Sequence, residues 1–126
     1  MKNELEELFT DSSPFNESEI VSLIKPFVTI QKNNFDIFLY NIDKFSADDK
    51  ILLYILAKKI LKFKKYIPEE TISALEFHKK TGIKKGTVDP AFKNLNESGL
   101  LVGSKDTYEI PNIKIPEIIK RLKNKI

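Results

Sequence analysis

The sequence contains no cysteine and only one histidine, and this shortage of metal-binding and nucleophilic side chains restricts its chemistry. Without cysteine, the chain can form neither disulfides nor thiolate metal sites. A metal site would have to be built from carboxylates, and the lone imidazole of His78 is better explained by a packed structural role. We therefore expect neither a bound metal nor a cofactor.

Long apolar runs are also missing, because no stretch approaches the ~18 residues of a membrane-spanning helix. The first nine residues, MKNELEELF, are too acidic and too weakly apolar for a signal peptide. Of the 126 residues, 41% are hydrophobic and 31% are charged, which is typical of one globular domain with a real core. We expect a protein of the cytoplasm with no membrane partner.

The charges are distributed unevenly along the chain. Residues 1–50 carry a net charge of −5, from five lysines and ten acidic residues. Residues 51–126 carry +8, from sixteen basic and eight acidic residues. A basic region suits a polyanion partner, because binding to phosphates releases their counterions. The alternative is that lysine is simply the usual solvated residue of this chain.

The most informative segment is 71–111, whose pattern predicts a helix, a tight turn, a second helix and a β-hairpin. The first helix is expected to place Leu75 and Phe77 on its apolar face. It should end at Gly82, which can adopt the left-handed conformation required there. The second helix is expected over about residues 87–98, and the hairpin over about residues 100–110.

Local signals predict how this second helix begins. Thr87 is expected to cap it, because its hydroxyl can accept from a free backbone N–H. Asp89 in the first turn would complement the helix dipole, and Pro90 would be tolerated there because first-turn N–H groups have no helical partner. The apolar residues at helical spacing are Val88, Ala91, Phe92 and Leu95.

Three stretches carry a resemblance to a known family. They are EFHKKTGI (Glu76 to Ile83), GTVD (Gly86 to Asp89) and KNLNESGLL (Lys93 to Leu101). Together they resemble the winged helix-turn-helix family, in its MarR-like or archaeal regulator form. The resemblance implies a mainly α fold with small β-hairpins (α+β), and a dimeric transcriptional regulator that binds double-stranded DNA.

The resemblance also implies which residues contact DNA. They are Lys84, Lys85, Thr87, Asp89, Lys93, Asn94 and Lys105. In this family the second helix enters the major groove, where Lys93 could donate to guanine and Asn94 could pair with adenine. Lys84 and Lys85 would approach phosphates from the turn, and Lys105 would do so from the wing.

Some features favour a different use of the same fold. Pro90 stands where relatives often have a base-contacting residue, Asp89 would be repelled by phosphate, and Asp106 lies beside the single wing lysine. The alternative is a winged-helix module that binds another protein and not DNA. Its partner surface would then lie on the N-terminal helices or hairpin.

The N-terminal third is interpreted as an acidic extension, residues 1–45, that packs on the domain or mediates dimerisation. It should contain a helix over 2–9, a helix capped by Asn16, and a hairpin over 28–40. A helix over 35–43 is the alternative to the second strand of this hairpin. Asn33 and Asn34 would supply the positive φ of the hairpin turn.

The domain itself should span residues 46–126. Ser46 is expected to begin a buried central helix that reaches Phe63, with Asp48 and Asp49 favouring its start and lysines at a solvated end. Pro68 should begin the next helix, together with Glu69 and Glu70.

A final helix is predicted from Pro116. Its apolar face could pack against the winged-helix domain, pair with a second copy or lie near DNA, and pairing with a second copy is the expected use. The adjacent carboxylates at 48–49 and 69–70 are explained as helix-start residues. Because the sequence suggests no nucleophile with a base and an orienting group, we expect no enzyme activity.

Overall fold

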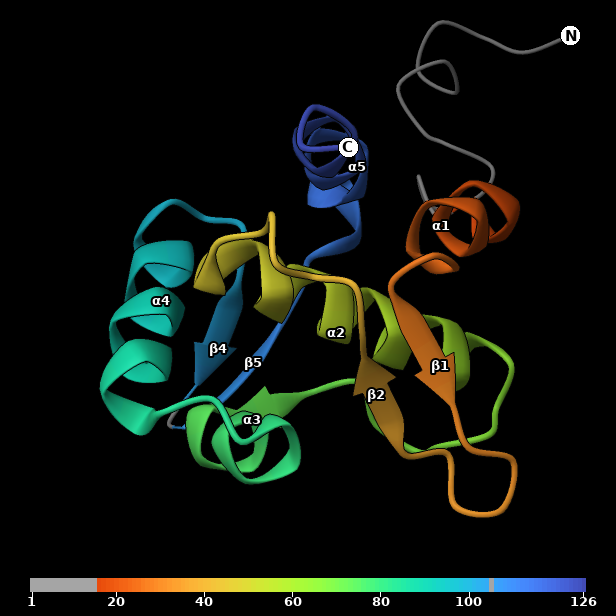
Figure 1. Ribbon diagram of the computed structural model, residues 1–126, viewed down its shortest axis with the longest axis horizontal. Helices are drawn as coiled ribbons and strands as arrows, with labels where there is room; N and C mark the ends of the chain where they lie inside the picture. Colours follow the sequence, from red (N-terminus) through yellow and green to blue (C-terminus); the bar gives the residue numbers. More distant parts are fainter. Residues whose placement is uncertain (1–15, 105) are drawn as a thin grey trace, which may run out of the picture.

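The computed structural model describes residues 16–104 and 106–126, and these form a mixed α+β structure. Within these ranges there are five α-helices and two small antiparallel sheets, as Figure 1 shows. The prediction of an α+β chain with small hairpins is therefore confirmed. In this part of the chain, each helix is too short or too polar to span a bilayer.

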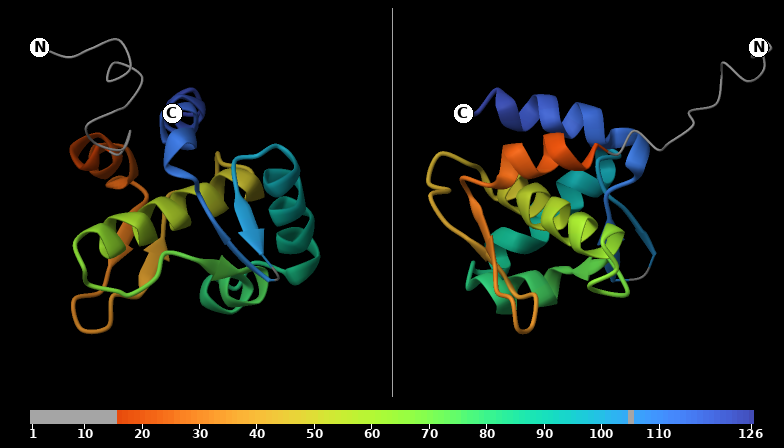
Figure 2. Two further views of the ribbon diagram at one scale, coloured as in Figure 1. Left: turned by 180° about the vertical axis from the view of Figure 1, so that it is seen from behind. Right: turned by 90° about the vertical axis from the view of Figure 1, so that its right-hand side faces the viewer.

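The central helix α2 (Ala47–Phe63) organises the structure, and the other elements surround it (Figures 1 and 2). Ser46 caps it as predicted, because its Oγ accepts from the backbone N–H of Asp49 at 3.2 Å. Apolar side chains are buried all round its first two turns, as expected of a core helix. The prediction that the lysines at the end of this helix are solvated is only partly right, since Lys59 is 4% exposed.

The N-terminal elements pack against α2. Helix α1 (Glu17–Ile24) is capped by Asn16, whose side chain accepts from the Glu19 N–H at 3.0 Å. Strands β1 (Val28–Ile30) and β2 (Ile37–Leu39) then form the predicted antiparallel hairpin. The predicted helix over 2–9 lies outside the described residues.

The conformation of the hairpin turn differs from the prediction. Phe35, rather than Asn33 or Asn34, has the positive φ, at 60°. The Asn34 side chain instead accepts from the Asp36 N–H at 2.9 Å and so closes a local turn. This leaves the left-handed position to the aromatic residue that follows.

A second group of elements follows α2 in the order β3 (Ile72–Ser73), α3 (Ala74–Thr81), α4 (Lys85–Glu97), β4 (Val102–Ser104) and β5 (Thr107–Glu109). Strand β5 lies between β3 and β4, and both pairings are antiparallel. The predicted hairpin after α4 is therefore present, and β3 adds a third strand that was not predicted.

The predicted helix from Pro68 is wrong. The chain is irregular from 68 to 71, and α3 begins only after Ser73, whose Oγ accepts from the Glu76 N–H at 3.0 Å. Ile72 pairs with Tyr108 in the sheet instead of entering a helix. The Ser73 cap and this distant strand pairing outweigh the local preference of Pro68 for a helix start.

The final helix α5 (Ile115–Lys123) follows a short 3₁₀ turn, η2 (Asn112–Lys114). Figure 2 shows α5 beside α1 above the central helix, and the two helices are in contact. The four apolar side chains of α5, namely Ile115, Ile118, Ile119 and Leu122, are buried. This face is covered within the chain and is not available for the expected pairing with a second copy.

Candidate nucleic-acid interface

The turn between α3 and α4 is fixed by hydrogen bonds and by one left-handed residue. Gly82 ends α3 with φ 75°, as predicted, and its N–H donates to His78 O. His78 is half-buried, and its Nδ1 donates to Ile83 O at 2.7 Å, which places the proton on that nitrogen. Thr81 Oγ1 donates to Phe77 O at 2.7 Å. These contacts set the direction in which α4 leaves α3.

Helix α4 packs through its predicted core residues and leaves its other sides open. The buried residues are Val88, Ala91, Phe92 and Leu95. The Phe92 ring packs against that of Phe77, with ring centroids 5.8 Å apart. The prediction that Leu75 and Phe77 share an apolar face of α3 is wrong for Leu75, which is 47% exposed, while Phe77 is buried. Residues two apart on a helix point to nearly opposite sides, so these two cannot share a face.

The start of α4 corrects several local predictions. The helix begins at Lys85, and Lys84 occupies the cap position without a side-chain hydrogen bond. Thr87 is therefore inside the first turn and does not cap the helix, and Asp89 falls beyond the first turn. Pro90 is in the helix interior, where its missing N–H leaves the carbonyl of Gly86 without its helical donor.

The residues predicted to contact DNA are exposed wherever they are described. Those residues are Lys84, Lys85, Thr87, Asp89, Lys93 and Asn94, whereas Lys105 lies outside the described ranges. They do not form one patch. Lys85, Asp89 and Lys93 follow each other at four-residue intervals on one flank of α4. Thr87 and Asn94, seven residues apart, share the opposite flank.

The first of these flanks borders a groove of ≈ 560 Å³ between α4, the start of α3 and the β4–β5 hairpin. Lys85, Lys93 and Asn96 line it from α4. Leu75 from α3 and Tyr108 from β5 line it from the other sides. Asn96, Leu75 and Tyr108 were not among the residues predicted to contact a partner. Asn96 extends the same helical spacing and could have been found, but the other two come from separate elements.

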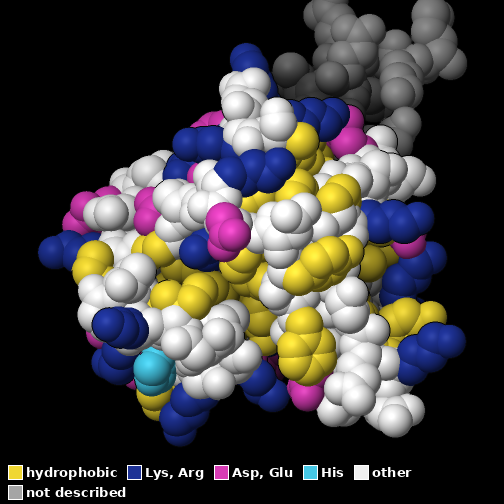
Figure 3. Space-filling view, viewed as in Figure 1, with side chains coloured by type: hydrophobic (Ala, Val, Ile, Leu, Met, Phe, Trp, Pro, Cys, Tyr) yellow, Lys and Arg dark blue, Asp and Glu magenta, His cyan; other side chains and the backbone are white. Residues whose placement is uncertain are grey.

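Opposite charges balance each other in this groove. Lys85 Nζ lies 3.0 Å from Asp89 Oδ2, and Asp106 lines the groove together with Lys93. On the face shown in Figure 3, basic and acidic side chains are likewise interspersed around a central apolar area. The groove can therefore hold a polar or amphipathic partner, and its net charge alone does not select an anion.

Comparison with protein-family models, with curated proteins and with solved structures found no match for this chain.

Proposed function

We propose that residues 46–126 form a winged helix-turn-helix domain that binds double-stranded DNA and regulates transcription. The observation that carries this proposal is the order α2, β3, α3, α4, β4 and β5, with β5 between the other two strands. A helix, a strand, a helix-turn-helix and a hairpin that pairs back onto that strand are the parts of a winged helix.

In this proposal, α4 enters the major groove with its exposed sides. Its N-terminus suits a phosphate, because the first-turn N–H groups receive no side-chain cap and two lysines, Lys84 and Lys85, adjoin them. Lys93 and Asn94 are exposed two turns further along, where they can reach base edges. The β4–β5 hairpin is the wing.

Reading a palindromic site would require a two-fold dimer. Because the apolar face of α5 is buried against the rest of the chain, such a dimer would need another surface. Binding of this kind requires no cofactor, and we place it in the cytoplasm.

A second function is favoured by the chemistry of the α4 groove. Lys85 is paired with Asp89, Asp106 adds another negative charge, and Leu75 is 47% exposed beside them. An amphipathic segment of a partner protein would find both apolar contacts and mixed charges there. In that case the winged helix is a protein–protein interaction module that does not bind DNA.

Fluorescence anisotropy with generic duplex DNA at several salt concentrations separates the two functions. The test variant is Lys84→Glu/Lys85→Glu/Lys93→Glu. Its matched control, Lys25→Glu/Lys32→Glu/Lys120→Glu, makes the same charge change at exposed positions outside α3, α4 and the β4–β5 hairpin. For DNA binding through α4, the test variant should lose binding while the control retains most of it.

The salt dependence gives a quantitative check. If three lysines contact phosphates, removing them should lower the slope of log K against log salt by about 2 to 3. Absence of binding by the wild type at low salt would overturn the DNA proposal and favour the protein partner. Equal losses in both triple variants would place the DNA on some surface other than α4.

A further inference from the structure

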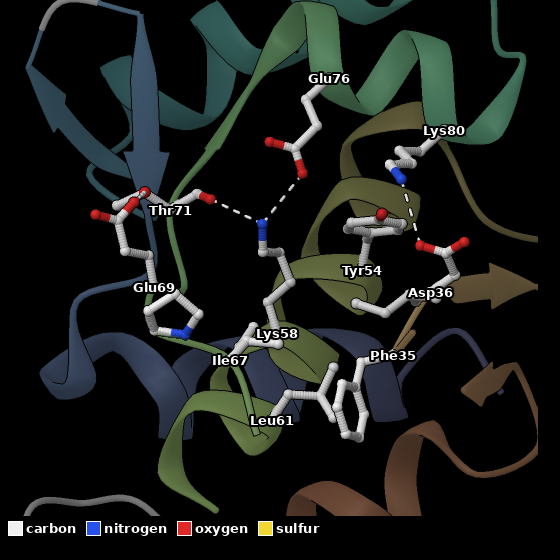
Figure 4. A pocket seen from close by; sticks show the side chains of 12 residues that line it. Phe35, Asp36, Tyr54, Lys58, Leu61, Ile67, Glu69, Thr71, Glu76 and Lys80 are labelled. Carbon is white, nitrogen blue, oxygen red and sulfur yellow. Dashed lines mark hydrogen bonds and ion pairs between the residues drawn. The ribbon is translucent and has the colours of Figure 1, made fainter. Parts of the chain in front are cut away.

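A second cavity is lined in part by α2 and shares no lining residue with the α4 groove. It has a volume of ≈ 270 Å³ and lies between the β1–β2 hairpin, α2, the segment 67–71 and α3, as Figure 4 shows. Its apolar walls are Phe35, Ile37, Leu61 and Ile67, and charged side chains surround them. Ligand sites usually begin at about 300 Å³, so a ligand here would be small.

Tyr54 supplies a polar group that the fold itself does not use. The residue is 3% exposed, and its hydroxyl has no hydrogen-bond partner among the described residues. Its ring packs edge-on against Phe77, with centroids 5.4 Å apart, so the core holds the ring in place. Figure 4 shows the side chain at the cavity wall, next to Asp36 and Lys80. The hydroxyl oxygen is not among the fully enclosed unpaired atoms of the described residues, so it is open to the cavity, where a ligand or water can complete its hydrogen bonds.

Carboxylates outnumber ammonium groups around the cavity, with three of the former and two of the latter. Both ammonium groups already have carboxylate partners. Lys58 Nζ lies 3.2 Å from Glu76 Oε2 and donates to Thr71 O at 2.9 Å. Lys80 Nζ lies 3.3 Å from Asp36 Oδ1. The third carboxylate, that of Glu69, has no ammonium partner among the described residues and accepts only from Thr71 Oγ1 at 3.4 Å. An added anion would therefore meet no unpaired cation here, whereas an added cation would meet this excess negative charge.

The environment of the Tyr54 hydroxyl likewise favours a cation over an anion. Burial raises the pKa of its hydroxyl to about 12, and the charges of Glu76 and Asp36 add to the rise. Negative charge at this point of the cavity is therefore disfavoured both by desolvation and by the two carboxylates.

Phe35 shows that the hairpin is held in an unusual conformation at the cavity wall. A φ of 60° is costly for a bulky residue with a Cβ, and such positions occur at ligand clamps. The Phe35 ring stacks on Tyr66 with centroids 5.1 Å apart, which stabilises the conformation. An aromatic wall also attracts a cation through its ring face.

We propose that this cavity binds a small organic cation, a primary ammonium group attached to a compact apolar body. The ammonium group donates to the Tyr54 hydroxyl oxygen and lies near the carboxylates of Asp36 and Glu76. The apolar body contacts Phe35 and the aliphatic wall. Because none of these residues belongs to the α4 groove, the inference does not depend on DNA binding.

Titration of isotope-labelled protein with phenethylammonium, followed by NMR chemical shifts, tests the proposal. Phenylacetate and phenethyl alcohol have the same ring on a short chain, but are anionic and neutral respectively. We expect saturable shifts at the cavity residues with phenethylammonium, affinity about tenfold weaker for the alcohol, and no saturable binding of phenylacetate. Absence of saturable shifts up to about 10 mM phenethylammonium would overturn the proposal, as would equal binding of phenylacetate.

Two conservative variants locate the ammonium group. Tyr54→Phe keeps the ring and removes the hydroxyl, and Asp36→Asn removes one carboxylate charge; each should weaken phenethylammonium binding by about two- to tenfold. Asp43→Asn makes the same charge change at an exposed position outside the cavity and should leave the affinity unchanged. If circular dichroism shows that both cavity variants are folded and they bind phenethylammonium as tightly as the wild type, this placement of the ligand is wrong.

Discussion

Arg121 Nε donates a hydrogen bond to Asp49 Oδ1 across 2.7 Å and so joins α5 to the first turn of α2. Asp49 is completely buried, whereas the Arg121 side chain is 34% exposed. Lys125 Nζ lies 3.8 Å from Asp49 Oδ2, an oxygen with no hydrogen-bond partner in the described part of the chain. Arg121 is therefore the main group that compensates a buried negative charge.

The first prediction concerns this ion pair. Arg121→Leu should lower the free energy of unfolding by about 3–5 kcal/mol, because it leaves the buried carboxylate of Asp49 without its main partner. The double variant Asp49→Leu/Arg121→Leu should recover most of the loss, since apolar side chains can replace a buried ion pair. Urea denaturation followed by circular dichroism measures both values.

Lys120→Leu is the matched control, because Lys120 is the exposed neighbour of Arg121 on α5. It should change the stability by no more than about 0.5 kcal/mol. A loss in Arg121→Leu no larger than in this control would show that Asp49 does not depend on the guanidinium.

The sequence predicted those features that depend on neighbouring residues. The caps at Asn16 and Ser46 were recognised because each side chain bonds to an N–H three residues along the chain. The left-handed end of α3 was found because Gly82 is the residue that best tolerates such a conformation. The spacing of α4 likewise gave its buried face of Val88, Ala91, Phe92 and Leu95.

Features that join distant residues could not be predicted in this way. Asp49 was interpreted as a helix-start residue, but its carboxylate is paired with a side chain 72 residues away. Strand β3 has two residues, too few for a periodic pattern, and it exists because Ile72 pairs with Tyr108. The α4 groove and the Tyr54 cavity are each formed by several elements, so no single stretch contains their pattern.

The second prediction concerns Lys59, which ties α2 to the segment before β3 and to the end of β5. Its ammonium group contacts the Glu70 carboxylate and donates to Ile110 O at 2.9 Å, with the residue only 4% exposed. Lys59→Met should cost about 3 kcal/mol of stability, because Glu70 and the Ile110 carbonyl lose their buried donor. Urea denaturation again provides the measurement.

Lys62→Met serves as the control, since Lys62 Nζ lies 3.5 Å from the same carboxylate but its side chain is 48% exposed. An exposed pair of this kind should contribute less than about 1 kcal/mol. Equal losses in the two variants would contradict the assigned role of Lys59.

The third prediction compares two glycines. A Cβ added at Gly103 would lie 2.1 Å from Thr107 O, so Gly103→Ala must displace the backbone of the β4–β5 hairpin. We expect a loss of about 1–3 kcal/mol, as in other overpacked sites. A Cβ added at Gly86, in the first turn of α4, meets nothing within 4 Å. Gly86→Ala should therefore gain up to about 1 kcal/mol from helix propensity.

Thermal denaturation of the two glycine variants distinguishes these effects, because the expected shifts in melting temperature have opposite signs. A melting temperature of Gly103→Ala equal to that of the wild type would show that the hairpin can open at this position without cost.

The fourth prediction concerns alkaline pH and follows from Tyr54, whose pKa is raised from 10.0 to about 12, chiefly by burial. The folded state resists ionisation of this hydroxyl more than the unfolded state does. The stability that this difference contributes is therefore complete below pH 10 and is lost as the pH rises through about 12. Urea denaturation across this range should show a smaller loss for Tyr54→Phe than for the wild type. Because the two proteins share all their other titratable groups, the difference between the two curves isolates Tyr54.

Tyrosinate absorbance provides an independent reading of the same group. The last tyrosine to ionise in the folded wild type should be absent in Tyr54→Phe and should remain in Tyr66→Phe, which removes a tyrosine that is 57% exposed. Glu76→Gln should bring this last step to lower pH, because it removes one of the two negative charges that oppose ionisation. If the late step persists in Tyr54→Phe, a different tyrosine is the shielded one, and the cavity hydroxyl is open to solvent.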